Sequence, residues 1–242
     1  MKAVVLAGGK GTRGKPYTDF FPKAMIPING KPAISYVINF LKSSKAIDEI
    51  IILTDLKGLG GQVQNYIQNN SNKKKISFVQ DSQSGTGGDL LHLASKLKGE
   101  TEFLLWFADN LCKIDVSKMK KHFEEKNSLA CIATRSQRKE ETGFAIVNDG
   151  IVTEFKEKPE IKLQMSECLG IYILSTKILS DIRKKSKVKQ VNLSFDILEE
   201  LSKKGKVSAF DIGKNSWIDA ESPVVLERNE KLVQKIIKQM GQ

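Results

Sequence analysis

The sequence has little histidine, cysteine or proline: its 242 residues include 2 histidines, 3 cysteines and 6 prolines. His92 and His122 do not stand near a cysteine in a metal-ligand spacing, so a zinc site and a histidine-based catalytic triad are both disfavoured. Cys112, Cys131 and Cys168 are odd in number and far apart, which argues against a disulfide framework and predicts reduced, structural thiols. Any chemistry must therefore rely on lysine, arginine and carboxylate side chains.

Long hydrophobic runs are also missing. The longest apolar stretches, 50–53 and 103–108, have the length of a strand and are far shorter than the roughly 20 residues that span a bilayer. The apolar stretch at 3–7 is too short for a signal peptide and is followed at once by two glycines. We therefore expect a soluble, cytoplasmic protein that has no membrane partner.

Acidic residues are the minority among the charged side chains, since Asp+Glu number 28 against Lys+Arg 39, a net charge of +11. Such an excess suits nucleic acid, because lysines that neutralise phosphates release counterions. The lysine clusters at 73–75 and within 184–189, however, lie in polar connections without the interleaved aromatic side chains that stack on bases. We predict that these lysines are solvated and that nucleic acid is not a partner; charge-driven nucleic-acid binding is the rival interpretation.

Short, β-branched apolar runs alternate with helix-patterned segments. Most of the runs are uniformly apolar, as strands covered on both faces of a parallel sheet must be. We predict an α/β fold in which a mostly parallel, Rossmann-like open sheet carries helices on both faces, within a single domain over 1–242. The expected strands are about 2–7, 48–54, 75–80, 101–107, 128–134, 144–147, 151–156, 168–174 and 206–212. The expected helices are 32–44, 86–98, 115–126, 175–185, 194–204 and 223–239.

The pattern changes between about 136 and 166, where charged and polar residues surround two short strands. Asn148-Asp149-Gly150 joins these strands, and an Asp-Gly pair between apolar segments is a hairpin signal. We interpret this segment as a small β insertion that serves as a lid or lies on the substrate side of the molecule.

A glycine-rich loop follows the first predicted strand. Backbone without Cβ atoms can approach an anion closely and present its N–H groups to it, so the loop predicts phosphate binding. The loop continues through Pro16 and Pro22, which stiffen it, and it carries two cations, Arg13 and Lys23, that can meet a triphosphate from different directions.

The loop fits the residue patterns of two well-known phosphate-binding motifs, but the residues that follow it do not fit either motif. Residues 9–14 fit the dinucleotide fingerprint G-x-G-x-x-G, but prolines follow instead of a helix, and the first acidic residue after the second strand, Asp55, is 41 positions beyond Gly14. Residues 9–15 fit G-x-x-x-x-G-K, but Pro16 stands where a P-loop needs a hydroxyl for Mg²⁺. The dehydrogenase and P-loop kinase interpretations are therefore set aside.

The loop resembles instead the signature of the sugar-1-phosphate nucleotidyltransferases, L-A-G-G-x-G-T-R followed by P-K, which here occupies residues 6–13 and 22–23. Further motifs follow in the family's order: I-P-I at 26–28, K-P at 31–32, G-T-G-G at 85–88, A-D-N at 108–110, E-K-P at 157–159, G-I-Y at 170–172 and W-I-D at 217–219. The sequence is thus similar to glucose-1-phosphate thymidylyltransferases and uridylyltransferases. The resemblance implies a nucleotide half at about 1–112 and a sugar-side half at about 113–242 that contains the insertion.

The reaction that the resemblance implies joins a nucleoside triphosphate to a sugar 1-phosphate, with pyrophosphate as leaving group and Mg²⁺ as cofactor. Anion repulsion dominates such a reaction, so catalysis consists mainly of positioning and charge neutralisation. The implied catalytic residues are Arg13, Lys23 and Asp109. Asp109 and Asp219 are the implied Mg²⁺ ligands, which suits the demand of that ion for oxygen. The implied sugar-phosphate residues are Gly143, Glu157 and Lys158. The implied nucleotide-binding residues are Leu6, Ala7, Gly8, Gly9, Gly11, Thr12, Arg13, Gln80, Gly85 and Thr86.

The substrates follow less directly. Gln80 precedes Gly85 by five residues, a spacing that resembles that of pyrimidine-using members of the family, where the side-chain amide pairs with the base edge as donor and acceptor. The resemblance thus implies UTP or dTTP, with glucose 1-phosphate as acceptor, and an ordinary polar residue at the end of a strand is the alternative interpretation of Gln80. A relative that uses GTP or CTP with mannose 1-phosphate or another sugar phosphate, and a catalytically silent nucleotide-sensing relative, remain alternatives. Self-association is left open.

Two departures from the family pattern bear on the site. Ala220-Glu221 follows Asp219 where a small or branched residue and glycine are usual, and we expect Glu221 to cap the helix that starts near Pro223 rather than to join a metal site. Cys168-Leu169 stands where many relatives have Asn-Ala, so the sugar is not transferred from the resemblance.

Overall fold

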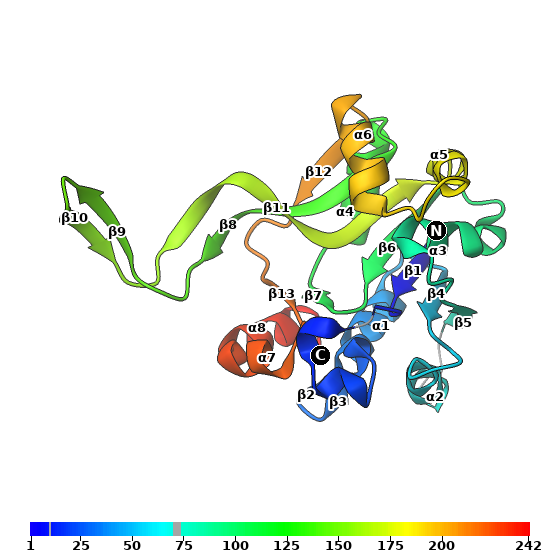
Figure 1. Cartoon of the computed structure of the whole chain (residues 1–242), viewed down its shortest axis with the longest axis horizontal. Coiled ribbons are helices and arrows are strands. Elements are labelled where there is room, and N and C mark those ends of the chain that lie inside the picture. Colours follow the sequence, from blue (N-terminus) through cyan, green and yellow to red (C-terminus); the bar gives the residue numbers. More distant parts are fainter. Residues whose placement is uncertain (10, 70–73) are drawn as a thin grey trace.

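A computed structural model of the chain describes residues 1–9, 11–69 and 74–242. Lys10 of the glycine loop and Lys73 of the first lysine cluster lie outside the described residues. The central sheet has seven strands (Figure 1) in the order β12 (Val207–Asp211), β8 (Ala130–Lys139), β11 (Glu160–Ser175), β6 (Glu102–Phe107), β1 (Lys2–Leu6), β4 (Glu49–Thr54) and β5 (Lys75–Gln80). Only β11 runs antiparallel to its neighbours in this sheet, so the predicted mostly parallel sheet is confirmed.

Helices cover both faces of the sheet, because the strands are apolar on both sides. Along β4, Ile50 and Ile52 belong to one buried cluster and Ile51 to the other. The first cluster includes side chains of α1 (Ala33–Ser43), α2 (Gly61–Asn69), α4 (Val116–Glu125) and α8 (Glu230–Gln239). The second includes those of α3 (Gly85–His92), α5 (Ile178–Ser186) and α6 (Glu199–Lys203) with the π-helical turn before it, Leu193–Leu198.

Some helices end earlier than predicted, and several short elements were not predicted at all. The predicted helix 223–239 breaks at Asn229 into α7 (Pro223–Arg228) and α8, and the predicted helix 86–98 ends at His92 before a 3-10 turn at Ala94–Leu97. Helix α2 was missed, because its buried face consists of only Val63 and Ile67. Four short strands were also missed: β2 (Pro27–Ile28), β3 (Lys31–Pro32), β7 (Asn110–Cys112) and β13 (Trp217–Asp219).

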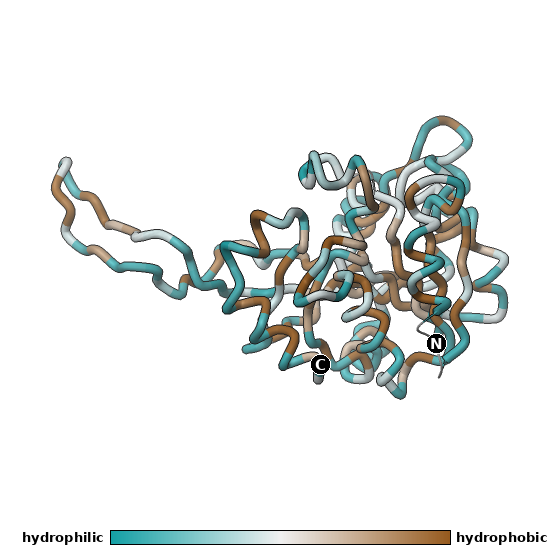
Figure 2. The backbone as a smooth tube through the Cα atoms, turned by 90° about the horizontal axis from the view of Figure 1, so that it is seen from below, coloured by the Kyte–Doolittle hydropathy of each residue, from teal (hydrophilic) through white to brown (hydrophobic). Residues whose placement is uncertain are grey.

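The predicted insertion forms an arm that leaves the body of the molecule, seen at the left of Figure 1 and again in Figure 2. It consists of β9 (Phe144–Asn148) and β10 (Ile151–Lys156), carried by the ends of β8 and β11. Asp149 and Gly150 have φ angles of 48° and 78°. These left-handed conformations are those of a tight hairpin turn, so the predicted hairpin is confirmed.

Two further observations bear on the predictions from composition. None of the described helices is long and apolar enough to cross a membrane. Cys112, Cys131 and Cys168 are all free thiols, but only Cys112 and Cys131 are buried; Cys168 is exposed and is therefore not part of the core.

Candidate active site

The described residues of the loop after β1 form no α-helix, as its prolines predict. It folds instead into three 3-10 turns, Thr12–Gly14, Tyr17–Asp19 and Lys23–Met25. Gly11 has φ 61°, and the hydroxyl of Thr18 donates a hydrogen bond of 2.7 Å to its carbonyl oxygen. A Cβ at Gly11 would stand 2.8 Å from the Thr18 methyl group, so glycine is required here both for the conformation and for the close approach.

Lys23 is the centre of the site. Its Nζ donates hydrogen bonds to Asp109 Oδ2 at 2.5 Å and to Asp219 Oδ1 at 2.9 Å. Asp109 follows β6, at the carboxyl edge of the parallel strands where α/β sheets place their ligands. Asp219 reaches the same place because β13 pairs with β7 in a register that sets Asp219 opposite Asn110. Two carboxylates that lie 86 and 196 positions after Lys23 in the sequence therefore share its ammonium group.

The electrostatics of this cluster are unbalanced toward negative charge. The pKa of Asp219 is raised, mainly because the carboxyl group is buried and secondly because the Asp109 carboxylate repels its negative charge. The Lys23 ammonium opposes this rise. Two carboxylates around one position, with phosphate oxygens to complete the shell, are the donor set that Mg²⁺ prefers. The described residues contain no group of three or more histidine, cysteine, aspartate or glutamate side chains that could hold a metal ion alone. The cluster therefore fits an ion that shares its coordination with a bound phosphate.

Arg13 extends the cluster toward solvent. Its guanidinium pairs with Glu221 through Nη1 and lies 3.7 Å from Asp219 Oδ2 through Nη2, while its side chain is 68% exposed. The expectation that Glu221 caps the following helix is wrong. Ser222 caps α7, because its extended backbone lets its hydroxyl accept from Val225 N, which leaves the Glu221 side chain free to reach Arg13.

A partly buried network beside Asp109 positions its carboxylate. Asn110 Nδ2 donates to Asp109 Oδ1 at 2.9 Å, and Trp217 Nε1 donates to Asn110 Oδ1 at 3.0 Å. Gly170 adopts φ 68° beside this pair, and a Cβ there would stand 2.6 Å from Asn110 Nδ2. The G-I-Y and A-D-N motifs thus meet in space. Sequence reasoning assigned no role to Asn110, since its partner is 107 residues away.

Trp217 also lines a cavity of about 950 Å³ at the root of the arm. Arg135 lines it, with its guanidinium carbon 4.7 Å from the centre of a Trp217 ring and its Nε 2.7 Å from Glu167. Lys158 lines the same cavity, with a left-handed φ of 48°. Arg135 is a cation that sequence reasoning did not select.

The other predicted sugar-side residues lie on the arm. Gly143 faces Phe155 and Glu157, because a Cβ at Gly143 would stand 2.4 Å from the Phe155 ring and 3.0 Å from a Glu157 carboxylate oxygen. Neither Gly143 nor Glu157 is among the described residues that line the cavity beside Trp217.

The predicted nucleotide residues beyond the glycine loop make contacts within the chain. Gln80 ends β5, where its Nε2 donates to Asp55 Oδ1 at 3.0 Å and its Oε1 accepts from Lys57 N at 3.2 Å. Thr86 Oγ1 accepts from Leu193 N at 2.8 Å, and Gly85, with φ 81°, packs against Val191. Both ends of the Gln80 amide are thus engaged in this structure.

Leu6 ends β1 and leads into the glycine loop, where Gly8 lies against a carboxylate that sequence reasoning did not select. A Cβ at Gly8 would stand 1.9 Å from Asp81 Oδ2. Ala7 is held between the strands, as its N donates to Leu53 O at 2.8 Å. A Cβ added at Gly9 would have no neighbouring atom within 4 Å, so the space beside Gly9 is open.

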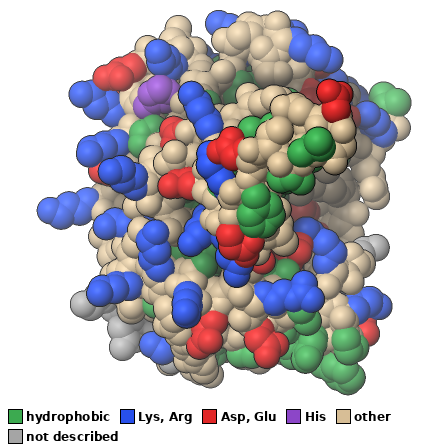
Figure 3. All heavy atoms as spheres, turned by 90° about the vertical axis from the view of Figure 1, so that its left-hand side faces the viewer, with side chains coloured by type: hydrophobic (Ala, Val, Ile, Leu, Met, Phe, Trp, Pro, Cys, Tyr) green, Lys and Arg blue, Asp and Glu red, His purple; other side chains and the backbone are tan. Residues whose placement is uncertain are grey.

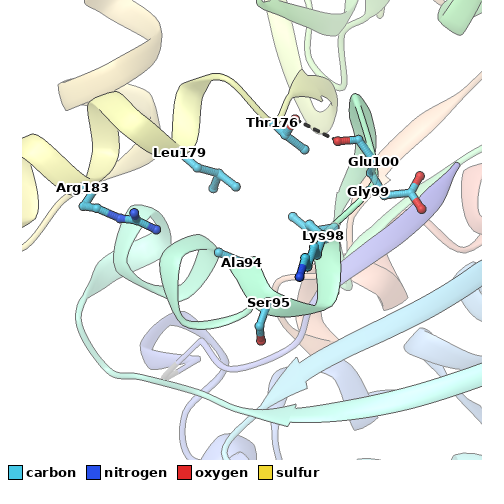
Figure 4. Close-up of a pocket in the computed structure, with 9 residues that line it drawn as sticks. Ala94, Ser95, Lys98, Gly99, Glu100, Thr176, Leu179 and Arg183 are labelled. Carbon is cyan, nitrogen blue, oxygen red and sulfur yellow. Dashed lines mark hydrogen bonds between the residues drawn. The ribbon is translucent and has the colours of Figure 1, made fainter.

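A second cavity of about 500 Å³ opens at the other edge of the sheet (Figure 4). Thr176, just after β11, and Glu100, just before β6, lie side by side in its lining, with Thr176 Oγ1 donating to Glu100 O at 3.0 Å. Since β6 begins here and Asp109 follows its far end, this cavity is separate from the cluster around Lys23.

Comparison with known proteins agrees with the geometry. Residues 2–227 match the family described as Nucleotidyl transferase. The chain is 31% identical to the D-glycero-alpha-D-manno-heptose 1-phosphate guanylyltransferase of Campylobacter jejuni, over 86% of this chain and 90% of that protein. It is 30% identical to the glucose-1-phosphate adenylyltransferase of Mycoplasma mobile, over 90% of this chain and 63% of that protein. The chain belongs to the nucleotidyl transferase family.

Other relatives are longer than this chain, and solved structures share its fold. The chain spans 60% of the length of a Sulfolobus acidocaldarius protein provisionally named mannose-1-phosphate guanyltransferase, to which it is 27% identical over 92% of its own length. A structure of a provisionally named glucose-1-phosphate thymidylyltransferase from Bacillus anthracis, solved with sucrose, aligns with a TM-score of 0.75 at 24% identity, over 97% of this chain and 95% of that one. The predicted fold class is thereby confirmed.

Proposed function

We propose that this protein transfers a nucleotidyl group from a nucleoside triphosphate to a sugar 1-phosphate, giving a nucleoside-diphosphate sugar and pyrophosphate. One observation carries the proposal: Lys23, Asp109 and Asp219 meet at the carboxyl edge of the parallel strands, beside Arg13 of the glycine loop. Two cations and two carboxylates at that edge suit a polyphosphate and the divalent cation that accompanies it.

The chemistry consists of holding anions together. In this proposal Arg13 and the backbone N–H groups of the glycine loop bind the triphosphate and the pyrophosphate that leaves. Asp109 and Asp219 would hold Mg²⁺, which would neutralise charge at the reacting phosphate when bound. Lys23, released from one of its carboxylates, turns its ammonium to the α-phosphate. The sugar phosphate oxygen then attacks the α-phosphorus in line with the leaving pyrophosphate.

The acceptor side is assigned to the cavity at the root of the arm. Lys158 supplies a cation to the sugar phosphate there, and Trp217, which lines the same cavity, is hydrogen-bonded to Asn110, which in turn donates to Asp109. Gly143 and Glu157 approach the sugar in this proposal through a bend of the arm. The β11 strand offers places for such a bend, because its pairing with β8 shifts register between Lys162 and Glu167.

For the base we propose a pyrimidine, UTP or dTTP, with glucose 1-phosphate as acceptor; the support is the Gln80 amide at the end of β5. The engagement of that amide by Asp55 and Lys57 favours the second candidate, a purine nucleotide, since base pairing would have to displace both contacts. Relatives named as guanylyl- and adenylyltransferases point to the same alternative.

The decisive experiment is a pyrophosphate-release screen of the common nucleoside triphosphates against a panel of sugar 1-phosphates with Mg²⁺. We expect turnover with at least one pair and none with Mg²⁺ removed by a chelator. Absence of turnover with every pair would instead support a silent nucleotide-sensing relative. Gln80→Ala is expected to relax the choice of base, and an unchanged ranking of triphosphates would discard the role of Gln80.

A further inference from the structure

Arg135 is a mostly buried cation that the proposed mechanism does not use. Its side chain, in β8, is 18% exposed, and its Nε donates to Glu167 Oε2 at 2.7 Å across the pairing of β8 with β11. Its guanidinium carbon lies 4.7 Å from the centre of a Trp217 ring. A planar guanidinium that is stacked on an indole and tethered at one nitrogen is held in one orientation, because rotation would break one of the two contacts.

The indole on which this guanidinium stacks is itself fixed. Trp217 Nε1 donates to Asn110 Oδ1 at 3.0 Å and to Leu169 O at 3.2 Å. Asn110 in turn donates to Asp109, a proposed Mg²⁺ ligand. One chain of contacts therefore runs from Arg135 through Trp217 and Asn110 to Asp109.

The two terminal nitrogens of Arg135 are free to bind a ligand. No described residue accepts a hydrogen bond from them, since the contact with Glu167 is made by Nε. No buried nitrogen or oxygen of a described side chain lacks a partner, so the terminal nitrogens, which have none, are open to solvent. Arg135 lines the cavity of about 950 Å³ at the root of the arm, through which solvent reaches them. Two adjacent N–H groups of a fixed guanidinium match two oxygens of one phosphate.

The charges at the root of the arm favour an anion. Eight lysine or arginine side chains and five glutamates are among the described residues that line the cavity. Figure 3 looks along the arm toward the body, where lysine and arginine side chains surround the arm. Such a cavity attracts small anions, and a fixed arginine within it favours those that carry two oxygens on one atom.

We propose that Arg135 binds the phosphate group of the acceptor sugar 1-phosphate through its two terminal nitrogens, in the same cavity as Lys158. The identity of the ligand rests on the proposed function, whereas the binding of an anion at Arg135 does not. Arg135 offers two directed hydrogen bonds where a lysine offers a point charge, so Arg135 sets the orientation of the phosphate. The contacts through Trp217 and Asn110 keep this binding group in a fixed relation to Asp109.

Steady-state kinetics tests the role of Arg135 in the reaction. Arg135→Gln removes the charge and keeps a polar side chain, and it should raise the KM of the sugar 1-phosphate about tenfold or more while the KM of the triphosphate stays within about twofold. The control is Arg138→Gln, which removes a cation of the same strand and cavity that pairs with Glu140 at 2.8 Å. Both KM values of this control should stay within about twofold of the wild type.

Circular dichroism checks that both variants keep the fold. An unchanged acceptor KM in Arg135→Gln, or an equal rise in Arg138→Gln, overturns the proposal. An equal rise of both KM values in Arg135→Gln would show a structural role, exerted through Trp217 and Asp109, and overturns it as well.

Chemical protection tests anion binding without a variant and without turnover. Phenylglyoxal modifies accessible guanidinium groups, and mass spectrometry of the peptides gives its rate at Arg135 and, as an internal control, at Arg183, which lines the cavity at the other edge of the sheet. Inorganic phosphate and at least one of glucose 1-phosphate and mannose 1-phosphate should slow the modification of Arg135 severalfold and leave that of Arg183 unchanged. Glucose and mannose should protect neither.

Three results of this experiment contradict the proposal: no modification of Arg135 in the absence of phosphate, equal protection of Arg183, and protection of Arg135 by inorganic phosphate alone. The two tests also separate this proposal from the proposed function. Turnover with an unprotected Arg135 would retain the transfer reaction and reject the site. Protection by a sugar 1-phosphate in a protein without turnover would retain the site and reject the reaction.

Discussion

Lys23 places a single ammonium between two carboxylates, and its side chain is only 12% exposed. A buried group of this kind is sensitive to the loss of one member, because the remaining charges lose their partner. The proposed reaction adds a second demand, since the same ammonium faces a reacting phosphate. Replacing Lys23 or Asp109 therefore affects both the stability of the cluster and the proposed chemistry, and a measurement of the fold must accompany the measurement of the rate.

Lys23→Ala and Asp109→Asn are each expected to lower kcat by orders of magnitude, because a charge that stabilises the transition state is removed. Pyrophosphate release measures the effect, and circular dichroism checks that the fold persists. Lys31→Ala, which removes an exposed lysine of β3, should keep the wild-type rate. Wild-type turnover in either site variant would remove that residue from the mechanism.

The raised pKa of Asp219 leads to a pH prediction. Burial and the Asp109 carboxylate keep the Asp219 proton bound to higher pH than the ordinary value of 3.8. Because the ionised carboxylate is the form that binds Mg²⁺, kcat/KM should fall toward acid over a range above that of an ordinary aspartate. A pH–rate profile of the free enzyme checks this. An acid limb at the ordinary aspartate value would contradict it.

Glu221 pairs with Arg13 and, in the proposed mechanism, competes with phosphate for its guanidinium. Removing its charge by Glu221→Gln should free the guanidinium and lower the Kd of the triphosphate about 2- to 5-fold, the size expected for a surface ion pair. Titration calorimetry with a nucleotide measures the change. Glu199→Gln, in α6 and without a role at the site, is the control, and equal affinities in the two variants would refute the competition.

At the scale of elements, the parallel strands support the site and the arm does not contribute to the core. Ile51, in β4, is fully buried between the sheet and its helices. Ile51→Ala should lower the free energy of unfolding by about 2–5 kcal/mol through lost burial and an unfilled cavity. Val188→Ala, at an 87% exposed position, should change it by less than about 0.5 kcal/mol. Urea unfolding compares them, and similar midpoints would contradict the assigned core.

The pairing of β7 with β13 is the element-scale event that makes the site. It brings Asp219 beside Asp109, and the N–H of Ala220 donates to Asp109 O at 2.7 Å. Each strand has only three residues, so neither carries a periodic signal that a sequence window can detect. The motifs A-D-N and W-I-D could be found in the sequence, but their contact could not.

For the whole molecule, the net charge of +11 is a weaker guide to partners than the placement of individual cations. Any binding to duplex DNA should be non-specific and lost between low and moderate salt, as counterion release requires. Arg13→Ala should leave that binding unchanged while weakening nucleotide binding. Fluorescence anisotropy over a salt series measures both. Salt-resistant DNA binding that depends on Arg13 would support the nucleic-acid interpretation.

The sequence by itself determined the α/β class, the absence of an α-helix from the described part of the glycine loop, and the hairpin turn, because uniform apolar runs, prolines and an Asp-Gly pair act through local geometry. Tertiary structure alone decided that Lys23, Asp109 and Asp219 share one point, that Glu221 pairs with Arg13 instead of capping a helix, and that the 136–166 segment projects as an arm. Those outcomes depend on which surfaces pack together over long separations in the chain, and no local pattern encodes that choice.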